Sequence, residues 1–86
     1  MEIKKIIYEE KVITEDLPII PQKMQDQIQH AIETKLLVYP EHFSIPLKGT
    51  LKPLRKFRVG DYRVLHMIDD DVITVYGIAH RSKVYR

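Results

Sequence analysis

The sequence predicts an α+β fold: a small antiparallel (mixed) sheet of four strands with two N-terminal helices packed on one face, in the order β-α-α-β-β-β. Two observations predict it. Apolar residues recur at helical spacing in the first half of the chain, and they alternate with a period of two in the second half. With 86 residues, the chain is expected to form one domain over residues 1–86.

In the first half, a short segment ending in apolar residues predicts a strand over residues 2–8. The following EEKVITEDLP predicts a short helix that stops before Pro18, because the residue preceding a proline avoids the α conformation. An amphipathic helix is then predicted over 21–38. It starts at Pro21, which suits a first helical turn, and its apolar side is made by Met24, Ile28, Ala31, Ile32 and Leu36.

In the second half, residues 40–53 contain three prolines and a glycine and predict a connecting loop. Strands are then predicted over 53–59 and 62–68, joined by the two-residue turn Gly60-Asp61 that suits a hairpin. Three aspartates at 69–71 predict a second turn, and the β-branched and aromatic stretch 72–79 predicts the fourth strand. The tail over 80–86 is too polar for the core.

Composition excludes several classes of function. The chain has no cysteine, so it can form neither disulfides nor thiolate sites. Its four histidines lack the spacing of metal ligands, and three glycines are too few for a phosphate-cradling loop, so no metal and no cofactor are predicted. No apolar run approaches the roughly 20 residues of a membrane helix, so we expect a cytoplasmic protein without a membrane partner.

The charges are distributed unevenly. Residues 1–43 hold five lysines and eight acidic residues, whereas residues 44–86 hold nine basic and four acidic residues. Such a basic region usually indicates an anionic partner, most often nucleic acid, and an ordinary solvated face is the alternative. Between positions 48 and 63 a single acid, Asp61, accompanies six basic residues: Lys48, Lys52, Arg55, Lys56, Arg58 and Arg63.

The predicted hairpin sorts these charges by face. With Gly60-Asp61 as the turn, Arg58 faces Arg63, and Lys56 lies on the same side. Phe57, Val59, Tyr62 and Val64 then lie on the side that covers the helices. Like charges directly opposite each other destabilise a sheet by roughly 0.2–1 kcal/mol, which indicates a site built for an anion. Phosphate suits the bidentate geometry of arginine.

These residues resemble a known family. RVGDYRV at 58–64, the preceding PLKGTLKPLRKF, the segment DLPIIP before the long helix, and IAHRSKVY at 78–85 are similar to the RelE branch of the RelE/ParE toxin superfamily of toxin–antitoxin modules. The resemblance covers almost the whole chain. RVGDYR is shared with ParE-type toxins, whereas the ending HRxxVY is the more specific feature of the RelE branch.

The resemblance implies a fold and task like those of microbial ribonucleases: a metal-independent endoribonuclease that cuts messenger RNA in the ribosomal A site. A ribose 2′-hydroxyl would attack its own 3′-phosphate to give a 2′,3′-cyclic phosphate. By position, Arg63 would hold the phosphate with support from Arg58, and Lys56 would be a clamp or base. Tyr85 would stack on an RNA base. Leu54 stands where some members carry another lysine.

Further residues complete the expected site. Arg81 is the best match for the family's C-terminal basic residue, and the neighbouring His80 could transfer protons or could be a structural hydrogen bonder. Additional RNA contacts are expected from Lys48, Lys52, Arg55 and Lys83. His66 alternates with Val64 and Ile68, which predicts a half-buried histidine with satisfied hydrogen bonds.

The resemblance also implies partners: a RelB-like antitoxin, the ribosome with its messenger RNA, and operator DNA bound through the toxin–antitoxin complex. Two alternatives stay open. The chain could be a ParE-type toxin of the same fold that inhibits gyrase and cuts nothing, or a non-catalytic module that binds RNA or protein through its basic face.

Overall fold

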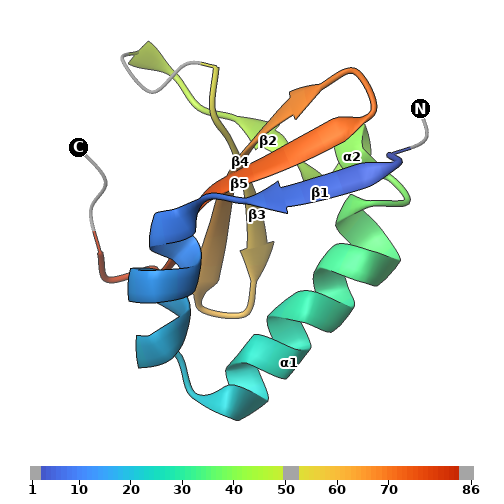
Figure 1. Ribbon diagram of the computed structural model, residues 1–86. Coiled ribbons are helices and arrows are strands. Elements are labelled where there is room, and N and C mark those ends of the chain that lie inside the picture. Colours follow the sequence, from blue (N-terminus) through green and yellow to red (C-terminus); the bar gives the residue numbers. More distant parts are fainter. Residues whose placement is uncertain (1–2, 50–52, 84–86) are drawn as a thin grey trace.

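The computed structural model describes residues 3–49 and 53–83. Its sheet has five strands in the spatial order β1-β5-β4-β3-β2 (Figure 1). β1 (Lys5–Tyr8) pairs in parallel with β5 (Val72–His80), and the other neighbours are antiparallel: β5 with β4 (Tyr62–Asp69), β4 with β3 (Arg55–Val59), and β3 with β2 (Ile45–Pro46). The mixed α+β architecture is therefore confirmed.

The predicted strand count was one too low. Residues Ile45–Pro46 lie inside the segment expected to be a loop, yet they form the short edge strand β2 and pair with Lys56 and Arg55. Two residues carry too little alternation to be recognised, and a proline is tolerated there because an edge strand has one side without ladder hydrogen bonds. The same segment also holds a single helical turn, α2 (Pro40–Phe43).

The helical elements follow the predicted order but differ in detail. The first is a wide turn, η1 (Val12–Asp16), continued by the 3₁₀ turn η2 (Leu17–Ile19). The predicted short helix does stop before Pro18, since η1 ends at Asp16, but a new 3₁₀ turn follows at once and tolerates Pro18 in its first turn. The long helix consists of α1 (Gln22–Ala31) and a final wide turn, η3 (Ile32–Leu36).

The helices cover one face of the sheet (Figure 1), and the core lies between the two layers. The core joins helical residues to sheet residues: Val12, Ile20, Ile28, Ile32 and Leu36 pack with Phe57, Val64, Ile73, Val75 and Ile78. We call this the covered face of the sheet and the opposite side the open face. None of the described helices is long and apolar enough to cross a membrane.

A β-bulge interrupts β5 and decides which of its side chains reach the core. Leu65 of β4 pairs with Gly77, but the next residue, His66, pairs with Val75. Tyr76 is therefore the extra residue. Because a bulge reverses the alternation, Val75 and Ile78 are both buried on the covered face although three positions separate them. The sequence signal for this strand gave no sign of the bulge.

Candidate functional site

The hairpin formed by β3 and β4 has the predicted register. Arg58 pairs with Arg63 and Phe57 pairs with Val64. Phe57 and Val64 are buried in the core, so alternation places the two arginines together on the open face. Gly60 makes the turn with a φ of 58°, a conformation that costs an L-residue energy and glycine almost none.

The turn end of this hairpin contains a polar pocket of about 220 Å³. Three arginines from separate segments meet there: Arg58 from β3, Arg63 from β4, and Arg81 from the turn after β5. Gly60, Asp61 and Tyr62 complete the lining. Two of the arginines, Arg58 and Arg63, form no ion pair with any residue in the ranges 3–49 and 53–83. The pocket therefore concentrates positive charge within reach of solvent.

Arg63 carries a further sign of a site for an anion. Its Nε atom is buried, and within the part of the chain that the structure describes it has no hydrogen-bond partner. A buried donor without an acceptor costs roughly 1–3 kcal/mol, so such groups concentrate where a ligand supplies the acceptor. The arginine most central to the predicted site therefore also has a buried donor without an acceptor.

Arg81 is held at the pocket by Asp61. The main-chain N–H of Arg81 donates to the carbonyl oxygen of Asp61 at 2.6 Å, and its Nε lies 3.4 Å from Oδ1 of the same residue. The β5 residue that pairs with Arg63 is Ala79, which has no charge. The third positive charge of the pocket therefore comes from beyond the end of the strand.

The remaining predicted RNA-contacting residues are dispersed. Lys56 pairs with Leu65 and shares the open face with Arg58, but it does not line the pocket. Lys48 is exposed in the segment after β2. Lys83 is exposed and lines a different cleft. Lys52 and Tyr85 lie outside the described residues.

Arg55 points to the covered face, away from the pocket. It is on the same side of β3 as the buried Phe57, and its side chain is bound by residues around α2. Its Nε donates to Ser44 Oγ at 2.7 Å, and its Nη2 donates to the Ser44 carbonyl at 2.8 Å and pairs with Glu41 at 3.3 Å. Arg55 is thus held in a network with Ser44 and Glu41, apart from the arginines of the pocket, and its contact with RNA stays a prediction. The alternation with Phe57 was the signal that could have shown this placement.

His66 belongs to the same network. The ring is fully buried, with Nδ1 2.9 Å from the Val64 carbonyl and Nε2 2.7 Å from Ser44 Oγ. A carbonyl can only accept, so Nδ1 carries the proton and Nε2 accepts from the serine hydroxyl. Burial lowers the pKa of His66 below its usual 6.5, and the charge of Arg55 acts in the same direction, against the hydrogen bond to Val64. The predicted satisfaction of its hydrogen bonds is confirmed, but the ring is fully buried and not half-buried as predicted.

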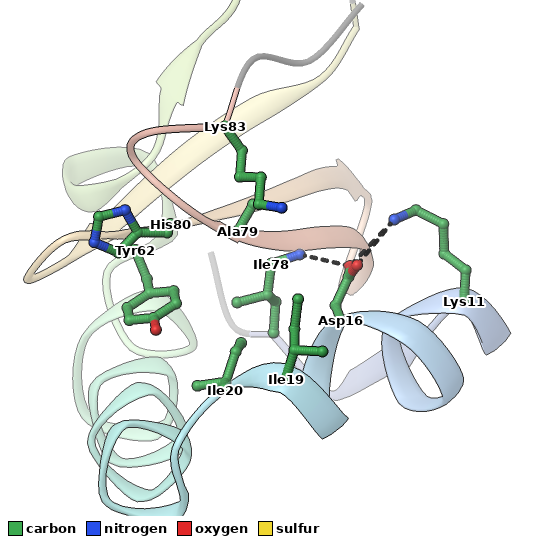
Figure 2. A pocket seen from close by; sticks show the side chains of 9 residues that line it. All are labelled: Lys11, Asp16, Ile19, Ile20, Tyr62, Ile78, Ala79, His80 and Lys83. Carbon is green, nitrogen blue, oxygen red and sulfur yellow. Dashed lines mark hydrogen bonds and ion pairs between the residues drawn. The ribbon is translucent and has the colours of Figure 1, made fainter.

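His80 also lies on the covered face (Figure 2). It is the last residue of β5, two positions after the buried Ile78, and its ring meets that of Tyr62 edge-on with centroids 5.4 Å apart. Its Nδ1 lies 3.0 Å from Ser82 Oγ. Both rings line a cleft of about 380 Å³ whose other walls are β5 and the η1–η2 segment. Strand alternation thus separates His80 from the arginine pocket.

Comparison with known proteins agrees with this architecture. The family described as ParE toxin of type II toxin-antitoxin system, parDE, matches residues 5–85. Toxin RelE of Mycobacterium tuberculosis is 36% identical over 73 residues, which cover 83% of this chain and 75% of that protein.

Solved structures share the fold. The toxin–antitoxin complex RelBE2 of M. tuberculosis contains a chain that matches with a TM-score of 0.82 and 23% identity, covering 90% of this chain and 96% of that one. An archaeal RelE–RelB complex from Pyrococcus horikoshii contains a chain with a TM-score of 0.63 and 25% identity, covering 98% and 100%. The extent of the family match and the identity to a RelE toxin show that this chain belongs to the RelE/ParE superfamily of toxins from type II toxin–antitoxin systems.

Proposed function

We propose that the protein is the toxin of a type II toxin–antitoxin system and acts as a ribosome-dependent endoribonuclease that cuts messenger RNA in the A site. The observation that carries the proposal is the pocket in which Arg58, Arg63 and Arg81 converge. Three arginines around one small polar pocket fit a phosphodiester, since each can donate two parallel hydrogen bonds to phosphate oxygens. Identity to a toxin named RelE supports the RelE branch, for which the resemblance implies messenger RNA as the substrate.

In the proposed reaction, the 2′-oxygen of a ribose attacks the adjacent phosphorus and loses its proton. The bond from phosphorus to the 5′-oxygen breaks, and that oxygen takes up a proton, leaving a 2′,3′-cyclic phosphate and a 5′-hydroxyl. Negative charge accumulates on the phosphoryl oxygens, where preorganised cations lower the barrier. Arg63 would contact these oxygens through its unsatisfied Nε, with Arg58 and Arg81 on either side.

Other residues would assist at the edges of this site. Lys56 is on the same face as Arg58 and would act as a clamp or base for the messenger strand. Tyr85 would stack on an unpaired base. We leave His80 and Arg55 out of the reaction, because their side chains lie on the covered face.

A RelB-like antitoxin would be the partner that silences the toxin. The structural neighbours from M. tuberculosis and P. horikoshii were solved in complexes of this kind. Such a partner would inhibit by covering the basic pocket, since an occupied pocket cannot take messenger RNA. The complex of the two would bind operator DNA.

The test is a reconstituted translation reaction in which the 5′ ends of the message are mapped after the purified protein is added. We expect cuts at A-site codons. The family match to ParE toxins favours a second candidate, inhibition of gyrase, so DNA supercoiling is measured in parallel. Loss of supercoiling activity with intact message would replace the ribonuclease proposal, and neither effect would favour a binding module.

Arg63 is expected to stabilise negative charge in the transition state of cleavage. Arg63→Ala should lower the rate of message cleavage by at least about 100-fold, the loss typical of removing one group that stabilises transition-state charge. Lys4→Ala is the matched control, because Lys4 is exposed beside Asp71 at the opposite end of β5 and loses the same charge. Equal cleavage by wild type and Arg63→Ala would remove Arg63 from the site.

A further inference from the structure

We propose that Asp61 is a positioning residue that holds Arg81 in the arginine pocket through its Nε, so that the two terminal nitrogens of the guanidinium can bind an incoming phosphate. The inference rests on the proposed function only in naming RNA phosphate as the anion. The positioning of Arg81 by Asp61 would serve the binding of any anion at the three arginines.

Arg81 needs a positioning residue because strand β5 ends before it. Ala79 is the residue that pairs with Arg63 on the open face, so the strand itself places no cation there. The next side chain, His80, lies on the covered face with Tyr62. Arg81 is the first residue after the strand, so strand alternation no longer determines where its side chain points. Its side chain is 70% exposed, so packing does not fix it either.

Asp61 supplies the missing restraint in two ways. Its carbonyl accepts the main-chain N–H of Arg81 at 2.6 Å and anchors the backbone of the turn. Its carboxylate lies 3.4 Å from Nε of Arg81 and directs the guanidinium toward the pocket. Because the carboxylate contacts Nε, the two terminal nitrogens of Arg81 are left to donate in parallel to a phosphate.

The carboxylate also opposes binding, because it is a negative charge beside the place of an anion. Asp61 therefore has two opposing effects on anion affinity: it positions Arg81, which strengthens binding, and it repels the anion, which weakens it. Only the first effect requires Arg81.

Because the two effects of Asp61 on anion affinity oppose each other, the test compares the sign of the affinity change with and without Arg81. Four proteins are compared: wild type, Asp61→Ala, Arg81→Ala and the double variant. Each is titrated with a single-stranded RNA oligonucleotide whose 2′-hydroxyls are methylated, so that it cannot be cut. We expect Asp61→Ala to weaken binding about threefold or more in the wild-type background. In the Arg81→Ala background, the same change should leave binding unchanged or strengthen it.

An equal effect of Asp61→Ala in both backgrounds would overturn the proposal, since it would show that Asp61 does not act through Arg81. So would a gain of affinity in the wild-type background. Asp61→Asn retains an oxygen that can accept from Nε and should lose less affinity than Asp61→Ala. A loss as large as that of Asp61→Ala would count against the directing role of the side chain. Thermal unfolding of each variant checks that the turn is intact.

A second titration with inorganic pyrophosphate separates this proposal from the ribonuclease proposal. Pyrophosphate probes the pocket without any cleavage of RNA. Dependence of the Asp61 effect on Arg81 in this titration, together with an uncut message in translation, would retain the positioning role and reject the ribonuclease. Cleavage of the message without that dependence would reject the positioning role alone.

Discussion

Two arginines three positions apart on β3 have side chains on opposite faces of the sheet. Arg58 is exposed and lines the polar pocket, whereas Arg55 lies on the covered face and makes three contacts through its Nε and Nη2, two with Ser44 and one with Glu41. The difference follows from alternation along the strand, which puts odd positions on the covered face and even positions on the open face. A count of basic residues therefore overestimates the cations available to RNA.

The buried network around Arg55 gives a prediction for stability. Ser44 is 4% exposed, and its Oγ joins Arg55 Nε to His66 Nε2. Ser44→Ala should lower the free energy of unfolding by about 1–3 kcal/mol, because both partners would lose a buried hydrogen bond. Urea unfolding measures the change. Ser82→Ala, which removes only an exposed contact to His80, should change it by less than about 0.5 kcal/mol.

His66 predicts how stability depends on pH. Its pKa in the folded protein is lowered below the unfolded value of about 6.5, mainly by burial. The unfolded chain therefore binds more protons at this position, so the stability that His66 contributes is complete above about pH 6.5 and is lost as the pH falls below it. Unfolding measured from neutral to mildly acidic pH should show this decline.

The matched variant for that experiment is His66→Gln, which removes the titrating group and can still donate and accept hydrogen bonds. It should be less stable than wild type at neutral pH and should lose less stability on acidification. If the two proteins lost equal stability between neutral and mildly acidic pH, a group other than His66 would be responsible for the decline.

At the level of elements, the sequence predicts best where a pattern is long or a turn is short. The Gly60-Asp61 turn fixed the pairing of Arg58 with Arg63, and the structure has that register. The long helix was also recognised from its apolar side. Arg81 reaches the pocket only because β5 ends at His80 and the next turn contacts Asp61, so spacing could not place it; the family resemblance did. The strand β2 and the bulge at Tyr76 depend on tertiary packing and left no local pattern.

The hairpin turn between β3 and β4 contributes to stability through the conformation of Gly60. Gly60→Ala should lower the free energy of unfolding by about 1–2 kcal/mol, because an L-residue is strained at a φ of 58°. A Cβ at this position would meet only the Met24 side chain, at 3.9 Å, so strain and not collision is the cause. Asp70→Gly in the next turn, where φ is 57°, should have the opposite sign. Both changes are measured by thermal unfolding.

For the whole molecule, charge is divided between the two layers. The acidic excess lies in residues 1–43, whose described part holds the helices and β1, and the basic excess lies in residues 44–86, whose described part holds the other four strands. The arginine pocket is built entirely by residues from the basic second half of the chain. An approaching anion therefore meets positive potential at the pocket and negative potential on the helices. Such an arrangement orients a polyanion before contact and makes its binding sensitive to salt.

The dependence of binding on salt concentration can be expressed as a number of neutralised phosphates. For single-stranded nucleic acid, the logarithm of the binding constant falls with the logarithm of salt concentration by about 0.7 per neutralised phosphate, so the slope gives the number of phosphates that the protein neutralises. Arg63→Ala should reduce the slope by about 0.7, whereas Lys4→Ala, at the other end of β5, should leave it unchanged. Fluorescence anisotropy with the uncleavable RNA at several salt concentrations measures it. Equal slopes for Arg63→Ala and Lys4→Ala would mean that the overall charge of the chain, and not the pocket, binds the RNA.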